Sequence, residues 1–218
     1  MNRFPSTCRW IALLATFVLF ACGRPPSLGE PSLYSLSGRV RLTGTTIDGD
    51  GKVGTTRVVD DADGVLVELL SGHDVIARAQ TIRGVYTFAG LAPGAYQTQA
   101  LVNANVWDKS AVFTIVKTDL TAGDTLRLTS QGDLYPVPNP VVTESTIYFA
   151  LPDTMIVDVR IKDMAGQTVR RLLEAPRPPG INQVLWNGSD SLQVPVQGRH
   201  YWVTLDAGTD QRAQLLFR

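Results

Sequence analysis

Apolar and polar residues alternate along most of the chain after residue 34. In the segment 35–43, Leu36, Val40 and Leu42 fall on one side of an extended strand, and the residues between them are mostly polar or charged. The same two-residue period predicts further strands in the ranges 65–69, 75–81, 86–88, 96–102, 111–116 and 125–129. No helical period follows residue 21. The pattern therefore predicts an all-β fold.

The alternation resumes after a cluster of prolines at positions 136, 138 and 140. Ile147, Phe149 and Leu151 share one face of a strand, and the range 157–161 repeats the pattern. Later strands are expected within TVRRLL, INQVLWNG, HYWVTLD and QRAQLLFR. A chain of 218 residues has room for two domains of ordinary size. We predict two tandem antiparallel β-sandwiches, at 35–129 and 130–218.

The first residues have the pattern of a secretory signal peptide. Arg3 and Arg9 precede the apolar stretch Trp10–Ala21, which is shorter than the roughly 20 residues that a membrane-spanning helix needs. Leu19-Phe20-Ala21-Cys22 resembles the lipobox of bacterial lipoproteins, with Phe20 where a small residue is usual. The resemblance implies cleavage between Ala21 and Cys22, followed by attachment of lipid to Cys22. The alternative is an ordinary signal peptide with an incidental cysteine.

Lipidation at Cys22 would decide where the protein resides. A cysteine thiolate reacts with a lipid donor far more readily than a serine hydroxyl, and two or more acyl chains form a stable membrane anchor. Cys8 would be removed with the signal peptide, so no free thiol would remain. Residues 22–34, rich in Pro, Gly and Ser, would form a flexible tether. By resemblance to Gram-negative lipoproteins, Gly23 favours the outer membrane over the inner.

The segment GVYTFAGLAPGAY, residues 84–96, carries a family resemblance. Together with SGRVRL and DGVLVELLSG before it, the segment resembles the carboxypeptidase regulatory-like domain, a small prealbumin-like β-sandwich. The resemblance implies that Tyr86 and Phe88 point inward and that Pro93-Gly94 forms a turn before Tyr96. Such domains are generally non-catalytic, which implies a role in spacing, stabilisation or binding.

The C-terminal part resembles the Ig-like domain of flagellar hook-capping proteins and the related C-terminal sorting domains of type IX secretion cargo. The matching segments are YPVPNPVV, STIYFALP, VRIKDMAGQTVRRLL, Trp186-Asn187-Gly188 and the strand 198–202. Val137 is inserted into the usual motif, and Val141 replaces an aromatic residue. The resemblance leaves two interpretations open. The part is a structural module, or it is a sorting signal of a secreted or surface cargo or adhesin.

An acidic, glycine-rich segment, TTIDGDGKVGTTRVVDDADG, provides the candidates for a metal site. Calcium prefers hard oxygen ligands, and five carboxylates are available, those of Asp48, Asp50, Asp60, Asp61 and Asp63. The spacing does not match an EF-hand, because Lys52, Val53 and Val59 occupy positions where that loop needs a ligand or a glycine. A solvated loop without a metal is the favoured prediction.

Charge and motif content disfavour nucleic acid binding and catalysis. The 20 basic and 20 acidic residues balance, so no polyanion is expected as a partner. His73 and His200 lie in different predicted domains, and no hydrolase, metalloprotease or phosphate-binding motif is present. Trp107, Trp186 and Trp202 form either core residues or a sugar-stacking platform. We predict a non-catalytic, lipid-anchored envelope protein with no cofactor and with an envelope protein or polysaccharide as its partner.

Overall fold

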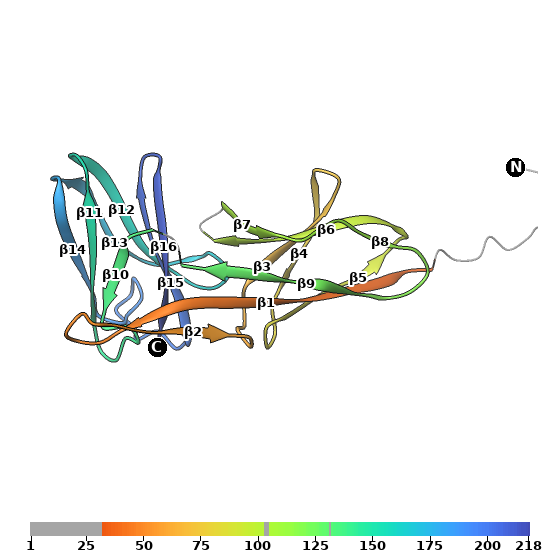
Figure 1. The fold of residues 1–218 in the computed structure, drawn as a ribbon, viewed down its shortest axis with the longest axis horizontal. Helices are drawn as coiled ribbons and strands as arrows, with labels where there is room; N and C mark the ends of the chain where they lie inside the picture. Colours follow the sequence, from red (N-terminus) through yellow and green to blue (C-terminus); the bar gives the residue numbers. More distant parts are fainter. Residues whose placement is uncertain (1–31, 103–104, 131) are drawn as a thin grey trace, which may run out of the picture. The chain divides into compact units, whose positions relative to one another are not determined.

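The computed structural model describes residues 32–102, 105–130 and 132–218, with only the backbone described at 105–107. This part of the chain forms sixteen strands and no helix, so the all-β prediction is confirmed (Figure 1). It accordingly contains no helix long and apolar enough to cross a membrane. The strands are β1 (Tyr34–Ile47), β2 (Val53–Val59), β3 (Leu66–Ser71), β4 (Asp74–Gln80), β5 (Val85–Leu91), β6 (Gly94–Val102), β7 (Asn105–Lys109), β8 (Phe113–Ile115), β9 (Leu120–Thr129), β10 (Leu134–Val137), β11 (Ser145–Leu151), β12 (Met155–Lys162), β13 (Thr168–Arg177), β14 (Gly180–Trp186), β15 (His200–Ala207) and β16 (Asp210–Phe217).

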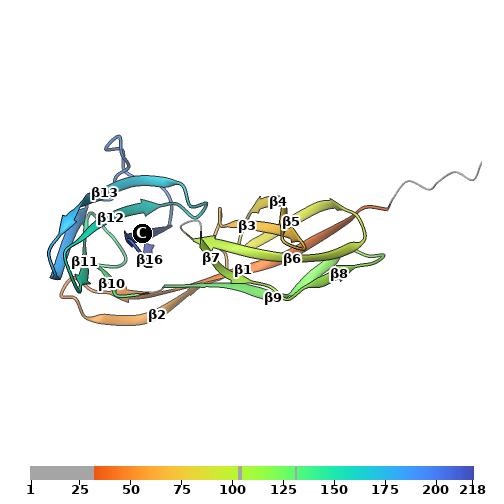
Figure 2. The same ribbon diagram turned by 90° about the horizontal axis from the view of Figure 1, so that it is seen from above.

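Strands β1 to β9 form two sheets that enclose the first core. One sheet has the order β2-β1-β5, with β9 also paired to β1, and the other has the order β4-β3-β6-β7, with β8 paired to β6. The pair β1–β9 is parallel, which departs from the antiparallel arrangement predicted (Figure 2). Leu36, Val40 and Leu42 are buried as the alternation predicts. Tyr86 and Phe88 also point into this core.

Strands β10 to β16 form two further sheets around a second core. Their orders are β10-β11-β14 and β13-β12-β15-β16, and all the named strand pairs in them are antiparallel. The predicted inward residues of β11 and β12 are buried, and the fully buried Trp186 packs among them. The Trp186 ring meets Tyr201 edge-on, with a centroid separation of 5.8 Å.

The loop prediction for the acidic segment 45–64 was wrong for half of its length, because residues 45–47 and 53–59 lie in strands. Strand β1 continues to Ile47, a tight turn follows, and β2 returns along β1 with Leu42 opposite Val59. The backbone N–H groups of Asp50 and Lys52 both donate to Oδ1 of Asp48, which closes the turn. The run Gly54–Val59 contains mostly β-branched residues, which favour a strand.

The first core includes residues from the C-terminal part of the chain. Trp202, Leu215 and Phe217 belong to the same buried apolar cluster as Leu42. The end of β1 is joined to the 138–140 segment by two backbone hydrogen bonds between Ile47 and Asn139, of 2.8 and 2.7 Å. The named sheets do not mix strands from before and after residue 130, and the domain boundary at 129/130 stays a prediction.

Candidate functional site

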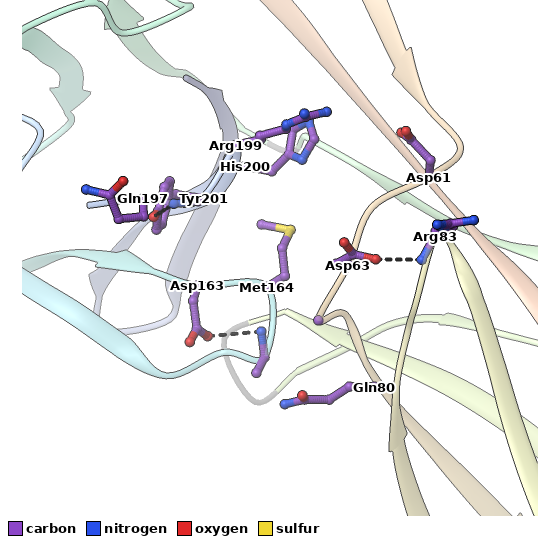
Figure 3. Close-up of a pocket in the computed structure, with 13 residues that line it drawn as sticks. Asp61, Asp63, Gln80, Arg83, Asp163, Met164, Gln197, Arg199, His200 and Tyr201 are labelled. Carbon is purple, nitrogen blue, oxygen red and sulfur yellow. Dashed lines mark hydrogen bonds between the residues drawn. The ribbon is translucent and has the colours of Figure 1, made fainter. Parts of the chain in front are cut away.

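A polar cleft of about 660 Å³ is bordered by four separate segments of the chain. They are the loop 61–64 after β2, the β4–β5 turn, the β12–β13 turn at Asp163 and the segment 197–201 that leads into β15. Figure 3 shows the side chains of Asp61, Asp63 and Arg83 on one side of the cleft and that of Gln197 on another. The cleft is lined largely by charged and amide side chains.

The β12–β13 turn is held in one conformation by Asp163. Its carboxylate Oδ1 accepts hydrogen bonds from the backbone N–H groups of Ala165 and Gln167, both at 2.9 Å. The backbone carbonyl of the buried Met164 accepts a hydrogen bond from the N–H of Leu66, at 3.3 Å, at the start of β3. This side of the cleft is therefore attached to the first core.

The loop 61–64 is also fixed by hydrogen bonds. Oδ1 of Asp63 accepts the backbone N–H of Arg83 at 2.5 Å. The buried Thr81 hydroxyl donates to the carbonyl of Ala62 at 2.6 Å and accepts the N–H of Val65 at 3.0 Å. These bonds hold the neighbouring Asp61 at the edge of the cleft, where it has no hydrogen-bond or ion-pair partner among the described residues.

A smaller hollow of about 200 Å³ adjoins the cleft and carries positive charge. It is lined in part by Arg57, Arg199 and His200, and it shares Asp61, Arg199 and His200 with the larger cleft. The Arg57 guanidinium carbon lies 4.9 Å from the centroid of the Phe217 ring. The His200 ring meets the same ring edge-on at 6.1 Å. One buried aromatic ring thus positions both groups.

Electrostatics favour the neutral form of His200. Burial lowers the pKa of its imidazole, the positive charges of Arg57 and Arg199 lower it further, and the carboxylates of Asp61 and Asp63 oppose these effects. Each of these four charged groups is therefore close enough to influence the imidazole. Near neutral pH, His200 is therefore a hydrogen-bonding group without a charge of its own.

The five aspartates considered for calcium do not form a single cluster. Asp48 and Asp50 lie at the turn before β2, whereas Asp60, Asp61 and Asp63 follow its other end. A strand of seven residues separates the two groups by about 20 Å. Asp60 is paired with Arg41. Among the residues that the structure describes, no group of three or more His, Cys, Asp or Glu could hold a metal ion. Calcium binding here stays untested.

The other sequence-based candidates have different outcomes. Cys8, the cleavage site Ala21-Cys22 and most of the tether 22–34 lie outside the described residues. The core interpretation is confirmed for Trp186 and Trp202, because both are buried and leave no ring face for a sugar, whereas the side chain of Trp107 is not among those described.

Sequence reasoning considered neither Arg57 nor Arg199 as a functional residue. The two are separated by more than half of the chain, and no local motif surrounds either of them. The only local signal was that Arg199 adjoins His200.

No family model matches the chain, and no curated protein does. Among solved structures, the chain is similar to a DUF3823 family protein from Parabacteroides merdae, with 14% identity, coverage of 86% of this chain and 99% of that chain, and a TM-score of 0.34. It is also similar to a proposed carbohydrate binding protein from Bacteroides uniformis, with 11% identity, coverage of 85% and 99%, and a TM-score of 0.34. A third similarity is to dimeric latent PorU from Porphyromonas gingivalis, with 15% identity, coverage of 74% and 17%, and a TM-score of 0.29. At these low TM-scores the similarities assign no function.

Proposed function

We propose that the chain is a non-catalytic protein of a bacterial cell envelope, anchored in the outer membrane by lipid on Cys22 and serving a structural, display or binding role. The observation that carries this proposal is the sequence Leu19-Phe20-Ala21-Cys22 at the end of the apolar stretch Trp10–Ala21. A covalent lipid on Cys22 would be its only attached group. Membrane attachment then depends on a thiol that serine cannot replace.

The fold after the tether suits a protein held at its N-terminal end. Strand β1 (Tyr34–Ile47) begins twelve residues after Cys22 and pairs with β2, β5 and β9. Its last residue, Ile47, is hydrogen-bonded to Asn139. A load applied at the tether would therefore pass directly into a strand with partners along most of its length. This arrangement supports a spacing or display role.

The test is metabolic labelling with an alkyne analogue of palmitate in a Gram-negative host. Wild-type protein and Cys8→Ser are expected to incorporate the label and fractionate with the outer membrane. Cys22→Ser is expected to lose both properties. Cys8→Ser is the matched control because it removes the other cysteine, which the proposed cleavage discards. Equal labelling of Cys22→Ser would refute the anchor.

Intact-mass spectrometry of the same samples addresses the alternative of a secreted cargo or adhesin with a C-terminal sorting signal. The anchor proposal expects an acylated N-terminus at Cys22 and an unprocessed sequence through Arg218. Loss of residues 130–218 from the protein in the native host would instead support the sorting alternative. Protease treatment of intact cells then distinguishes a surface-facing protein from a periplasmic one.

A further inference from the structure

Two arginines in the smaller hollow carry charges that the protein does not pair. Arg57 and Arg199 form no ion pair with any carboxylate in the described part of the chain. The neighbouring Asp60 is already paired with Arg41. Arg218, which also lines the hollow, donates to the backbone carbonyls of Gly188 and Val196. Asp61 is the remaining carboxylate that lines the hollow, and one carboxylate against three arginines leaves excess positive charge there.

The side chains of Arg57 and His200 and the backbone of Arg199 are positioned before any ligand arrives. The ring of Phe217, only 1% exposed, lies against both Arg57 and His200. The backbone carbonyl of Arg199 accepts the N–H of Arg218 at 2.9 Å, which fixes the chain beside His200. Such preorganisation reduces the conformational entropy that binding costs.

We propose that Arg57, Arg199 and His200 bind the carboxylate or phosphate group of an acidic sugar. Guanidinium groups bind both kinds of oxyanion through paired, charge-assisted hydrogen bonds. A neutral imidazole adds one N–H donor without needing a charge. This inference does not depend on the lipid anchor, and either proposal can fail without the other.

The adjoining cleft explains why the ligand would be a sugar rather than a bare ion. Its volume of about 660 Å³ falls within the range typical of small-molecule sites. Asp61 lines both the cleft and the smaller hollow, and its unpaired carboxylate would accept hydrogen bonds from the hydroxyls of the ligand while repelling a second anionic group. Gln80 and Gln197 add amide groups that can both donate and accept. A sugar with one acidic group matches both regions: its acidic group would lie at the arginines of the hollow, and its hydroxyls would lie in the cleft.

Calorimetric titration of the purified full-length protein tests the proposal with five ligands. D-glucuronate is a sugar with a carboxylate, and glucose 6-phosphate is a sugar with a phosphate. Glucose lacks the acidic group, and inorganic phosphate and acetate lack the sugar. Binding of either acidic sugar at millimolar concentration is expected, with glucose and the free anions each at least about tenfold weaker. The preferred acidic sugar identifies the source of the oxyanion.

Variants locate the site. Arg57→Gln and Arg199→Gln are each expected to weaken binding of the acidic sugar by about tenfold or more, because each removes charge-assisted hydrogen bonds. Arg39→Gln, which changes an exposed arginine of β1 outside the cleft, is the matched control and should bind as wild type does. Circular dichroism establishes that each variant is folded. Arg199 is exposed, so its replacement tests the site even where Arg57→Gln fails to fold.

Four results would overturn the proposal. Absence of binding by both acidic sugars would exclude the site, and an equal loss of affinity in Arg39→Gln would place binding elsewhere. If inorganic phosphate binds as tightly as glucose 6-phosphate, or acetate as tightly as D-glucuronate, the site binds a bare anion and does not recognise a sugar. A wild-type affinity retained in Arg199→Gln would likewise contradict the assignment.

Discussion

Replacing Asn139 with alanine tests whether one amide joins the end of β1 to the end of β16. Its Nδ2 group donates to the backbone carbonyls of Thr45 at 2.8 Å and Leu215 at 3.0 Å. Its Oδ1 accepts the backbone N–H of Phe217 at 2.8 Å. The residue is fully buried, so water does not compete for these bonds in the native state. Alanine would leave two carbonyls and one N–H without this partner.

The expected loss follows from that geometry. A buried polar group left without its partner costs about 1–3 kcal/mol, and the small cavity left by the amide admits water that recovers part of the loss. For three groups we expect a loss of about 3–5 kcal/mol in the free energy of unfolding. Domains are stable by about 5–15 kcal/mol in total, so the change is large. It corresponds to a fall in Tm of about 6–20 °C for a chain of this size.

The assay is urea unfolding followed by tryptophan fluorescence, which reports on the buried Trp186 and Trp202. Gln183→Ala is the control, because this exposed amide of β14 has no side-chain hydrogen bond among the described residues and its loss should change stability by less than about 0.5 kcal/mol. Asn139→Asp retains an acceptor but loses both donated bonds, so it should also be destabilised. A loss below about 1 kcal/mol in Asn139→Ala, with an unchanged denaturant dependence, would refute the reasoning.

Two further substitutions address packing and pH. In Gly38→Ala, the new methyl group would lie 2.1 Å from Oη of the buried Tyr86. We expect urea unfolding to show that the free energy of unfolding falls by about 1–3 kcal/mol. The control Gly49→Ala, which has open space around the new methyl group, should leave that free energy nearly unchanged. An unchanged midpoint for Gly38→Ala would contradict this packing. Because folding lowers the pKa of His200, the unfolded chain takes up its proton first, so stability should fall as pH drops below about 6.5. Thermal unfolding measured over a series of pH values should show a smaller loss of stability at low pH in His200→Gln than in the wild type, whereas the control His73→Gln should resemble the wild type. If the wild type and both variants have the same dependence of Tm on pH, His200 does not cause the loss.

The alternation of residues correctly predicted the buried side of strands β1, β11 and β12. Ile147, Phe149 and Leu151 of β11 are 0%, 1% and 4% exposed, as the alternation along this strand indicates. Hydrophobic burial is a local property of a strand with a period of two, so one segment carries the information. Strand β2 was not predicted. Acidic, glycine-rich segments at 48–51 and 60–64 flank it, and they favoured a continuous loop over a strand made from the β-branched residues of Val53–Val59.

Contacts between distant segments could not be predicted in this way. Asn139 was noticed as part of a motif, but its role depends on Thr45 and Leu215, which are 94 and 76 residues away. Arg57 and Arg199 line one hollow because the Phe217 ring contacts both Arg57 of β2 and His200, the residue after Arg199. Neither the contacts of Asn139 nor the hollow leaves a pattern in the neighbouring sequence, because the path of the chain through the fold determines which distant residues meet.

The shared core also bears on how the C-terminal part is used. At Gly44 of β1, an added Cβ would lie only 2.9 Å from Cζ of Phe217 and 3.0 Å from Cβ of Leu215, so β1 and β16 pack tightly. Removing residues 130–218 would take Phe217, Leu215 and Trp202 away from the first core. Burial of each such side chain contributes about 1.5–3 kcal/mol, so the three together approach the stability of an average domain. A part whose removal costs this much is better suited to permanent structure than to a signal discarded after export.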